Sequence, residues 1–321
     1  MILITGGLGF VGQHVTRALL AAGESSVLVQ RRDPVLPDDL ASEEGRRVFT
    51  ERADITDLGA LLEVGKCHRV TGIVHLAGSV PWPPGAQPPV AGARMAVGGL
   101  LNVVQAACDW QVPRVGIAST IGVYGGVTAD PPYREDVALP VASGHVIPAF
   151  KKIGELLAGY LADATGIEIL SYRISLWGPG GNPASPCTAA PQLAHAAAGG
   201  SAPDFSALGS PPYAGDGLDM CYVKDGAAAI ALLQLAPRLT YRTYNIASGK
   251  VLTNAEVAAA VAAAVPSARF ELPEGRSPAS PGQAVCLDIS RLREDTGYQP
   301  AYDTRQAVAD YISWLRAGHQ Q

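Results

Sequence analysis

Two groups of polar residues have the chemistry needed for proton transfer. Thr120 and Tyr124 come directly after the apolar segment 115–119, which is expected to form a strand. Lys151 lies within the expected helix 144–165. Hydroxyl groups at the carboxyl end of a central strand are well placed for an active site. The sequence therefore predicts an active site where the segment 115–119 ends.

A glycine-rich turn near the start of the chain has the pattern of a phosphate cradle. Its glycines recur at every third position between an expected strand at 1–5 and an expected helix at 11–22. A pyrophosphate can approach such a turn closely, and the helix N-terminus offers it free N–H groups and a positive dipole end. A turn without a ligand could show the same spacing, but this one stands between a strand and a helix, as a dinucleotide site requires. We therefore predict cofactor contacts at Gly6, Gly9, Phe10, Val11 and Gly12.

The end of the second expected strand, 26–30, indicates which dinucleotide is preferred. A site for NAD normally places a carboxylate there to contact the adenosine ribose. This chain instead has Gln30, followed by Arg31 and Arg32. A guanidinium can bind the 2′-phosphate that a carboxylate would repel. We therefore expect NADP rather than NAD, with ordinary solvated loop charges as the alternative role of the two arginines.

Two later segments are expected to contact the rest of the cofactor. Asp54 could accept a hydrogen bond from the adenine amino group while Ile55 packs on the ring. As an alternative, Asp54 could cap the helix that begins near Leu58. Small residues after the expected strand 72–76 would let the backbone pass close to a ligand. The contacts predicted at this strand end are Leu76, Ala77 and Gly78.

Two tryptophans are candidate substrate contacts. Trp82 lies in a proline-rich loop, 79–89, on the ligand side of the expected sheet. It could line the substrate pocket or could anchor a lid. Trp177 follows the expected strand 168–174. We predict that Trp82, Trp177 and Thr120 bind the substrate.

Composition excludes several classes of protein. The chain has 321 residues, 48% of them hydrophobic, and a net charge of -5 without long charged runs, so neither nucleic acid nor a membrane surface is an expected partner. No apolar run reaches the ~18–20 residues of a membrane span. The five scattered cysteines suggest reduced thiols in a cytoplasmic protein. The six histidines form no cluster with metal-ligand spacing, so no metal is expected.

The order of the expected elements predicts the fold. Strands and helices alternate through residue 175, which is typical of a Rossmann-type, doubly wound parallel sheet. The later segments are expected to form a smaller C-terminal α/β lobe that binds the substrate. We expect residues 1–175, with parts of 220–250, to form the dinucleotide-binding domain, and residues 176–321 to form mainly the substrate lobe. Thr253 and Glu256 have the spacing of a capping box.

In its motifs, the chain resembles the extended short-chain dehydrogenase/reductases of the NAD-dependent epimerase/dehydratase type. The resemblance covers essentially the whole length, with the motifs in family order. They are TGGLGFVG at 5–12, Asp54-Ile55, VHLAG at 74–78, STIGVYG at 119–125, KKIGE at 151–155, GPGG at 178–181, YVKD at 222–225, YNIASG at 244–249 and GYQP at 297–300.

The resemblance implies a catalytic set with one member missing. It assigns to Thr120 the hydrogen bond to the substrate oxygen. To Lys151 it assigns the contact with the nicotinamide ribose and the lowering of a tyrosine pKa. That tyrosine, which moves the proton, would stand four residues before Lys151, where this chain has Ile147; if Lys152 were the family lysine instead, the position would be Pro148. His145 or Tyr124 could substitute for it, imidazole being the more suitable group near neutral pH. Otherwise the proton moves through water or substrate, or does not move at all.

The resemblance also bears on the substrate. Sugar-nucleotide members usually carry an arginine just before the strand that matches 221–223, where it binds the diphosphate, and this chain has Leu218 there. Arg276 could serve instead. An asparagine that the family often places near the active site is replaced by Met95 or Ala96.

Three functions therefore stay open. The first is an NAD(P)-binding enzyme that acts on a carbonyl or hydroxyl group of a small, non-nucleotide molecule. The second is a sugar-nucleotide epimerase or dehydratase, and the third is a cofactor-binding protein without redox turnover. Family members commonly dimerise through two long helices, which here would be 90–110 and 144–165, so the resemblance implies a homodimer.

Overall fold

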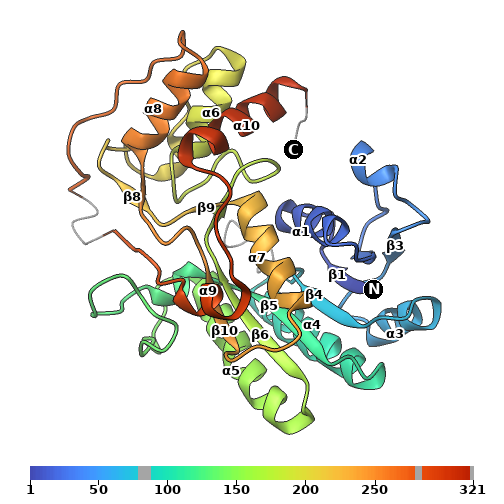
Figure 1. Ribbon diagram of the computed structural model, residues 1–321. Coiled ribbons are helices and arrows are strands. Elements are labelled where there is room, and N and C mark those ends of the chain that lie inside the picture. Colours follow the sequence, from blue (N-terminus) through green and yellow to red (C-terminus); the bar gives the residue numbers. More distant parts are fainter. Residues whose placement is uncertain (79–87, 279–283, 319–321) are drawn as a thin grey trace.

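A parallel sheet of seven strands forms the centre of the computed structural model, which describes residues 1–78, 88–278 and 284–318 (Figure 1). Its strand order is β10-β6-β5-β4-β1-β2-β3. The strands are β1 (Ile2–Thr5), β2 (Ser26–Gln30), β3 (Val48–Arg52), β4 (Gly72–His75), β5 (Arg114–Thr120), β6 (Glu168–Ile174) and β10 (Thr243–Ile246). The direction of strand progression reverses between β1 and β4, and ligands of such sheets bind in the crevice at the carboxyl ends of those strands.

Helices cover both faces of this sheet. Alternate residues of a strand point to opposite faces, so Ile2 and Ile4 belong to one core cluster and Leu3 to the other. On the first side pack α1 (Phe10–Ala21), α7 (Val223–Leu235) and α9 (Ser290–Thr296). On the second side pack α3 (Leu58–Cys67), α4 (Pro89–Asp109) and α5 (Val146–Thr165). The predicted Rossmann-type doubly wound sheet is thus confirmed, with helix and strand ends within a few residues of those expected.

A smaller lobe with its own hydrophobic core lies beside the sheet, at the top of Figure 1. Three helices pack together in it: α6 (Ala190–Gly199), α8 (Asn254–Ala264) and α10 (Thr304–Arg316). Two short sheets join it, β8 (Gly217–Leu218) with β11 (Leu252–Thr253), and β7 (Leu176–Trp177) with β9 (Cys221–Tyr222). The predicted capping box of Thr253 and Glu256 starts α8.

Most of the shortest helices and strands were not predicted from the sequence. Strand β9 lies within the expected strand 221–223, whereas the two-residue strands β7, β8 and β11 are too brief to show alternation. The same holds for the one-turn helix α2 (Asp38–Ala41) and for the 3-10 turns η1 (Ile121–Tyr124) and η2 (Ser206–Leu208).

Helix α4 differs from the expectation that no segment could span a membrane. Among the helices of the described residues, it alone has the length and the apolar composition of a span. The core helix of a soluble protein has the same properties, and α4 lies in the second core cluster with Leu100, Val103 and Val104 buried. We therefore regard α4 as a core helix.

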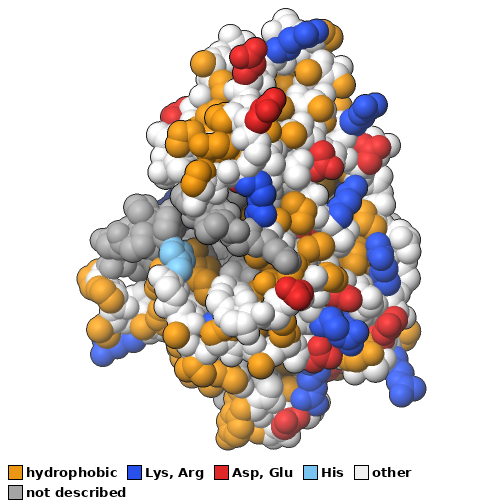
Figure 2. Space-filling view, turned by 90° about the vertical axis from the view of Figure 1, so that its left-hand side faces the viewer, with side chains coloured by type: hydrophobic (Ala, Val, Ile, Leu, Met, Phe, Trp, Pro, Cys, Tyr) orange, Lys and Arg blue, Asp and Glu red, His pale blue; other side chains and the backbone are white. Residues whose placement is uncertain are grey.

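On the face of the molecule seen in Figure 2, acidic and basic side chains are interspersed, and that face shows no continuous basic surface.

Candidate functional site

The glycine turn after β1 is shaped by close approaches of backbone to backbone. Gly6 has a φ of +70°, in the left-handed region that favours glycine. A Cβ atom on Gly12 would lie 2.3 Å from the Gly6 carbonyl oxygen and 2.7 Å from the Gly7 Cα atom. The start of α1 can therefore pack on the turn only because Gly12 has no side chain. Within the described residues no side chain caps α1 at Gly9, which leaves the first N–H groups of the helix to a ligand.

A cavity of about 350 Å³ adjoins this turn at the carboxyl ends of β1 to β4. Its wall contains seven of the predicted cofactor residues: Gly6, Gln30, Arg31, Asp54, Ile55, Ala77 and Gly78. Met95 of α4, one of the two candidates for the position of the family asparagine, also lines the wall. A turn built from Gly6, Gly7 and Gly9, an uncapped helix N-terminus and this cavity together fit a dinucleotide.

The other predicted cofactor residues lie outside this wall. Phe10 and Val11 begin α1, where the Phe10 ring meets His14 edge-on at 6.5 Å between ring centroids. Arg32 is exposed to solvent. The Leu76 N–H donates to the Thr5 carbonyl oxygen at 3.2 Å, which continues the pairing of β4 with β1.

Gln30 folds back onto the glycine turn. With its amide oxygen facing the turn, it accepts hydrogen bonds from the N–H groups of Gly7 (2.9 Å) and Leu8 (2.5 Å). A neutral amide thus stands at the strand end where an NAD site would hold a carboxylate.

Asp54 lies in the cavity wall but does not cap a helix. Its carboxylate accepts from the N–H (2.9 Å) and the hydroxyl (2.8 Å) of Thr56, and these bonds, with the charge of Arg31, keep the Asp54 pKa below its usual value. The cap of α3 is Asp57, which accepts from the Ala60 N–H at 3.0 Å. The alternative role of Asp54 as a helix cap is therefore wrong, because the helix begins one turn later than that role requires.

A second, smaller cavity of about 40 Å³ shares Ala77 and Gly78 with the first. Ile147 and Lys151, one helical turn apart on α5, both line it, as the four-residue spacing predicts. Lys151 is the only charged side chain in its described wall, and burial lowers the Lys151 pKa to about 8. The two cavities together extend from the glycine turn to Lys151.

His75 of β4 forms another part of this second wall. Its Nδ1 atom shares a hydrogen bond with the Thr5 hydroxyl at 2.8 Å. Burial, and then the charge of Lys151, lower the His75 pKa to about 3, so this imidazole is neutral at pH 7. It is a buried, packed residue of the strand.

Thr120 and His145 make local contacts near the second cavity. Thr120 ends β5, and its hydroxyl accepts from the Gly122 N–H at 3.2 Å. His145 caps α5, with Nδ1 accepting from the Ile147 N–H at 3.3 Å. Neither residue is among those that line the described cavity around Lys151.

Tyr124 is in the protein core. Its hydroxyl donates to the Asn245 Oδ1 atom (2.7 Å) and accepts from the Arg173 guanidinium (2.8 Å). Its ring stacks on Tyr133 with centroids 5.3 Å apart, and burial raises its pKa to about 12. The Tyr124 hydroxyl already donates one hydrogen bond and accepts another, and its pKa is raised. These observations favour a structural role for Tyr124 over the role of substitute acid or base.

A buried ion pair joins β6 to α5 beneath the site, and it was not predicted from the sequence. The Arg173 guanidinium of β6 binds the Glu155 carboxylate of α5, with a closest N–O distance of 2.7 Å. Glu155 also accepts from the Ser119 hydroxyl. Burial opposes the Arg173 charge, yet the hydrogen bond and charge of Glu155 raise the Arg173 pKa above its usual value. The pair holds α5, one turn after Lys151, against β6, and the Ser119 hydrogen bond holds the same helix against β5, the strand that ends at Thr120.

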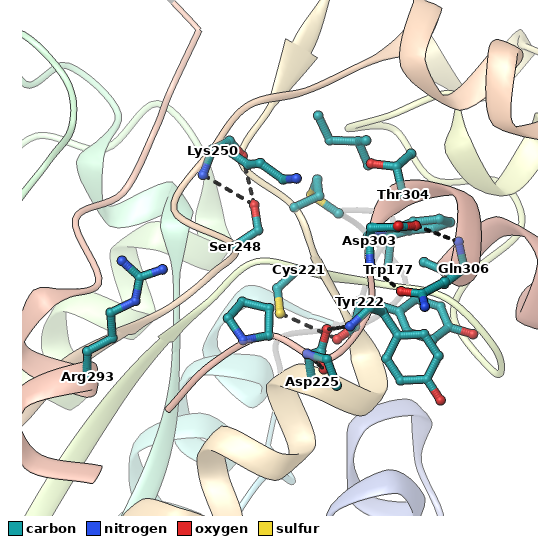
Figure 3. A pocket seen from close by; sticks show the side chains of 16 residues that line it. Trp177, Cys221, Tyr222, Asp225, Ser248, Lys250, Arg293, Asp303, Thr304 and Gln306 are labelled. Carbon is teal, nitrogen blue, oxygen red and sulfur yellow. Dashed lines mark hydrogen bonds between the residues drawn. The ribbon is translucent and has the colours of Figure 1, made fainter. Parts of the chain in front are cut away.

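Trp177 lies in a third cavity, away from Thr120. This cavity, of about 400 Å³, contains none of the predicted cofactor residues. Figure 3 shows Ser248 and Lys250 on one side of it and the rings of Trp177 and Tyr222 on another. The structure therefore does not bring Trp177 and Thr120 together. Trp82 lies outside the described residues.

Two substrate-related positions lie in the smaller lobe. Leu218 packs against the apolar core of that lobe. Arg276 lines a further cavity of about 170 Å³, together with Thr188 and Asn254. Among the described residues, no group of three His, Cys, Asp or Glu side chains is placed to hold a metal ion.

Comparison with known proteins agrees with this geometry. Residues 2–247 match the NAD dependent epimerase/dehydratase family, and the chain belongs to it. It is 28% identical to the UDP-glucose 4-epimerase of Azospirillum brasilense, covering 99% of this chain and 93% of that protein. It is also 28% identical to the dTDP-glucose 4,6-dehydratase of Streptomyces griseus, covering 98% and 93%.

A solved structure shows the same fold. The UDP-glucose 4-epimerase of Thermus thermophilus, in complex with NAD, superimposes with a TM-score of 0.78 at 22% identity, over 99% of both chains. Family members are NAD-dependent epimerases and dehydratases, in agreement with the prediction of a nicotinamide-dependent enzyme.

Proposed function

We propose that this chain is an NADP-dependent oxidoreductase that acts on a carbonyl or hydroxyl group of a small, non-nucleotide molecule. One observation carries the proposal: the cavity that fits a dinucleotide adjoins the cavity around Lys151, because Ala77 and Gly78 line both. The nicotinamide, when bound, would supply or accept a hydride. Lys151 would hold the nicotinamide ribose, and Thr120 would bind the substrate oxygen, as the family resemblance implies.

The preference for NADP rests on Gln30 and Arg31. Gln30 brings no negative charge to the ribose end of the cavity, and Arg31 lines the same wall. We expect Arg31→Ala to weaken NADPH binding about tenfold or more and NADH binding little, because a charge-assisted hydrogen bond contributes ~1.5–3 kcal/mol. Fluorescence titration with both dinucleotides measures this difference. Arg32→Ala, which changes an exposed arginine outside the wall, is the matched control. An equal loss for both dinucleotides would contradict the preference.

A non-nucleotide substrate is favoured by Leu218, which offers no cation to a diphosphate. The second candidate is a sugar-nucleotide epimerase or dehydratase, and Arg276 in its cavity favours it. Isothermal titration with UDP, UDP-glucose and dTDP separates the two. Nucleotide binding that Arg276→Ala removes would support the second candidate, and no binding at millimolar concentration would support the first.

A third candidate, which Ile147 motivates, holds the dinucleotide without redox turnover. Turnover of NADPH with a panel of ketones, aldehydes and alcohols by the wild-type chain supports the oxidoreductase. No turnover by wild type or by Ile147→Tyr, with intact NADPH binding, would support the third candidate.

The homodimer implied by the family has a candidate surface on α4 and α5. Leu156 is 76% exposed and Tyr160 69%, with Ile153 and Leu101 also exposed. We expect the wild-type chain to be a dimer and Leu156→Glu to be largely monomeric, because the charge would be buried in the apolar contact. Sedimentation velocity gives the masses. Val141→Glu, at an exposed valine outside these helices, should stay dimeric; a monomeric wild type would contradict the interface.

The proposed function also divides the chain into a part that binds the cofactor and a part that binds the substrate. Residues 1–175, with parts of 220–250, would bind the cofactor, since α7 and β10 pack with the main sheet. Residues 176–321 would mainly bind the substrate.

The five cysteines are free thiols, which suits a reducing compartment, and we infer a cytoplasmic location.

A further inference from the structure

The cavity beside Lys151 has room for the oxygen atom of a ligand. Its volume is about 40 Å³, and roughly 10–15 Å³ on this measure suffices for one water molecule. Ile147, an aliphatic side chain without a polar atom, forms the wall where the family tyrosine would stand. Lys151 and His75 are the titratable groups in that wall, and His75 is neutral.

Among the described residues that line this cavity, no carboxylate is present to neutralise the Lys151 ammonium. The same cavity is lined from α4 by Ala96 and Leu100, and from β5 by Ile117 and Ala118. Glu155, the next acidic residue of α5, is occupied by Ser119 and Arg173. Within the part of the chain that the structure describes, no hydrogen bond or ion pair to the Lys151 Nζ atom is present. The neighbouring Lys152, in contrast, donates to the carbonyl oxygens of Pro140 (2.5 Å) and Ala142 (3.1 Å).

We propose, resting on the proposed function, that Lys151 itself transfers the proton to and from the substrate oxygen in this chain. In the reducing direction the carbonyl carbon gains a hydride from a dihydronicotinamide, and the carbonyl oxygen gains a proton from the Lys151 ammonium, which becomes a neutral amine. In the oxidising direction the neutral amine takes the hydroxyl proton while the carbon loses the hydride. The lowered pKa of Lys151, about 8, provides both forms near neutral pH.

The first arm of the test measures protonation without turnover. The chain has five lysines, so biosynthetic labelling with [ε-13C]lysine gives few NMR signals, and Lys151→Met identifies the one of interest. We expect that signal to titrate near pH 8 in the full-length chain and to persist unchanged in Lys152→Met. Titration only above pH 10 would overturn the inference even where NADPH binds. Absence of NADPH binding would instead overturn the proposed function.

The second arm separates proton transfer from a purely electrostatic role. Lys151→Ala should lose at least 100-fold in turnover, and methylammonium should restore part of it. Tetramethylammonium, which has the charge but no N–H proton, should restore none. Equal rescue by both cations, or wild-type turnover in Lys151→Ala, would overturn the inference.

Discussion

Replacing Arg173 by methionine is expected to lower the free energy of unfolding by about 3–5 kcal/mol. Removing one member of a buried ion pair leaves the other charge uncompensated, and this cost exceeds the worth of the pair itself. Arg173 is 5% exposed and also donates to the Tyr124 hydroxyl and to the Glu135 carbonyl oxygen. Those acceptors would lose their partner as well. Urea denaturation followed by circular dichroism measures the change.

The double variant Arg173→Met with Glu155→Met is the control. It removes both charges and should recover a large part of the lost stability, because no buried carboxylate remains unpaired. A single variant as stable as wild type would show that the pair does not hold α5 to β6. A double variant less stable than the single one would show that Glu155 is stabilised by groups other than Arg173.

Lys151→Met is expected to have the opposite effect and to raise the free energy of unfolding by roughly 2–4 kcal/mol at pH 7. The Lys151 pKa falls from its ordinary value of 10.5 to about 8 in the folded chain, and each pKa unit corresponds to ~1.4 kcal/mol. Below pH 8 the amine is protonated in both states, so the folded chain carries the full cost of burying its charge. Removal of that charge stabilises the fold, as is common at sites that sacrifice stability for function.

The pH dependence distinguishes this effect from better packing of methionine. Between about pH 8 and 10.5 the unfolded chain holds more protons than the folded one, so the wild type gains stability and the advantage of Lys151→Met shrinks. Thermal unfolding of both proteins from pH 7 to 10.5 measures this convergence. Lys152→Met, which loses two hydrogen bonds to backbone carbonyls, should show no gain. A constant difference across the range would contradict the desolvated ammonium.

The cofactor cradle could be predicted because its constraints are local in sequence. The spacing of Gly6, Gly9 and Gly12 follows from a turn in which backbone meets backbone, and strand order then brings Gln30, Asp54 and Gly78 to the same edge. The four-residue spacing on one helix similarly predicts that Ile147 and Lys151 line one cavity.

Side-chain directions that depend on distant segments could not be predicted. Tyr124 is in the core because Asn245, 121 residues later, accepts from its hydroxyl. Trp177 is in its own cavity because β9 pairs with β7 and brings Tyr222 to it. The burial of Arg173 and Glu155 likewise depends on how α5 packs on β6, which no motif encodes.

Fluorescence titration of the wild-type chain with NADPH and NADH tests the central claim most directly, namely that the glycine turn and its cavity hold a nicotinamide dinucleotide. We predict saturable binding of both, tighter for NADPH. We also predict its loss in Gly12→Ala, where the added Cβ atom would lie 2.3 Å from the Gly6 carbonyl oxygen and displace the turn. Failure of the folded wild-type chain to bind either dinucleotide would contradict the account.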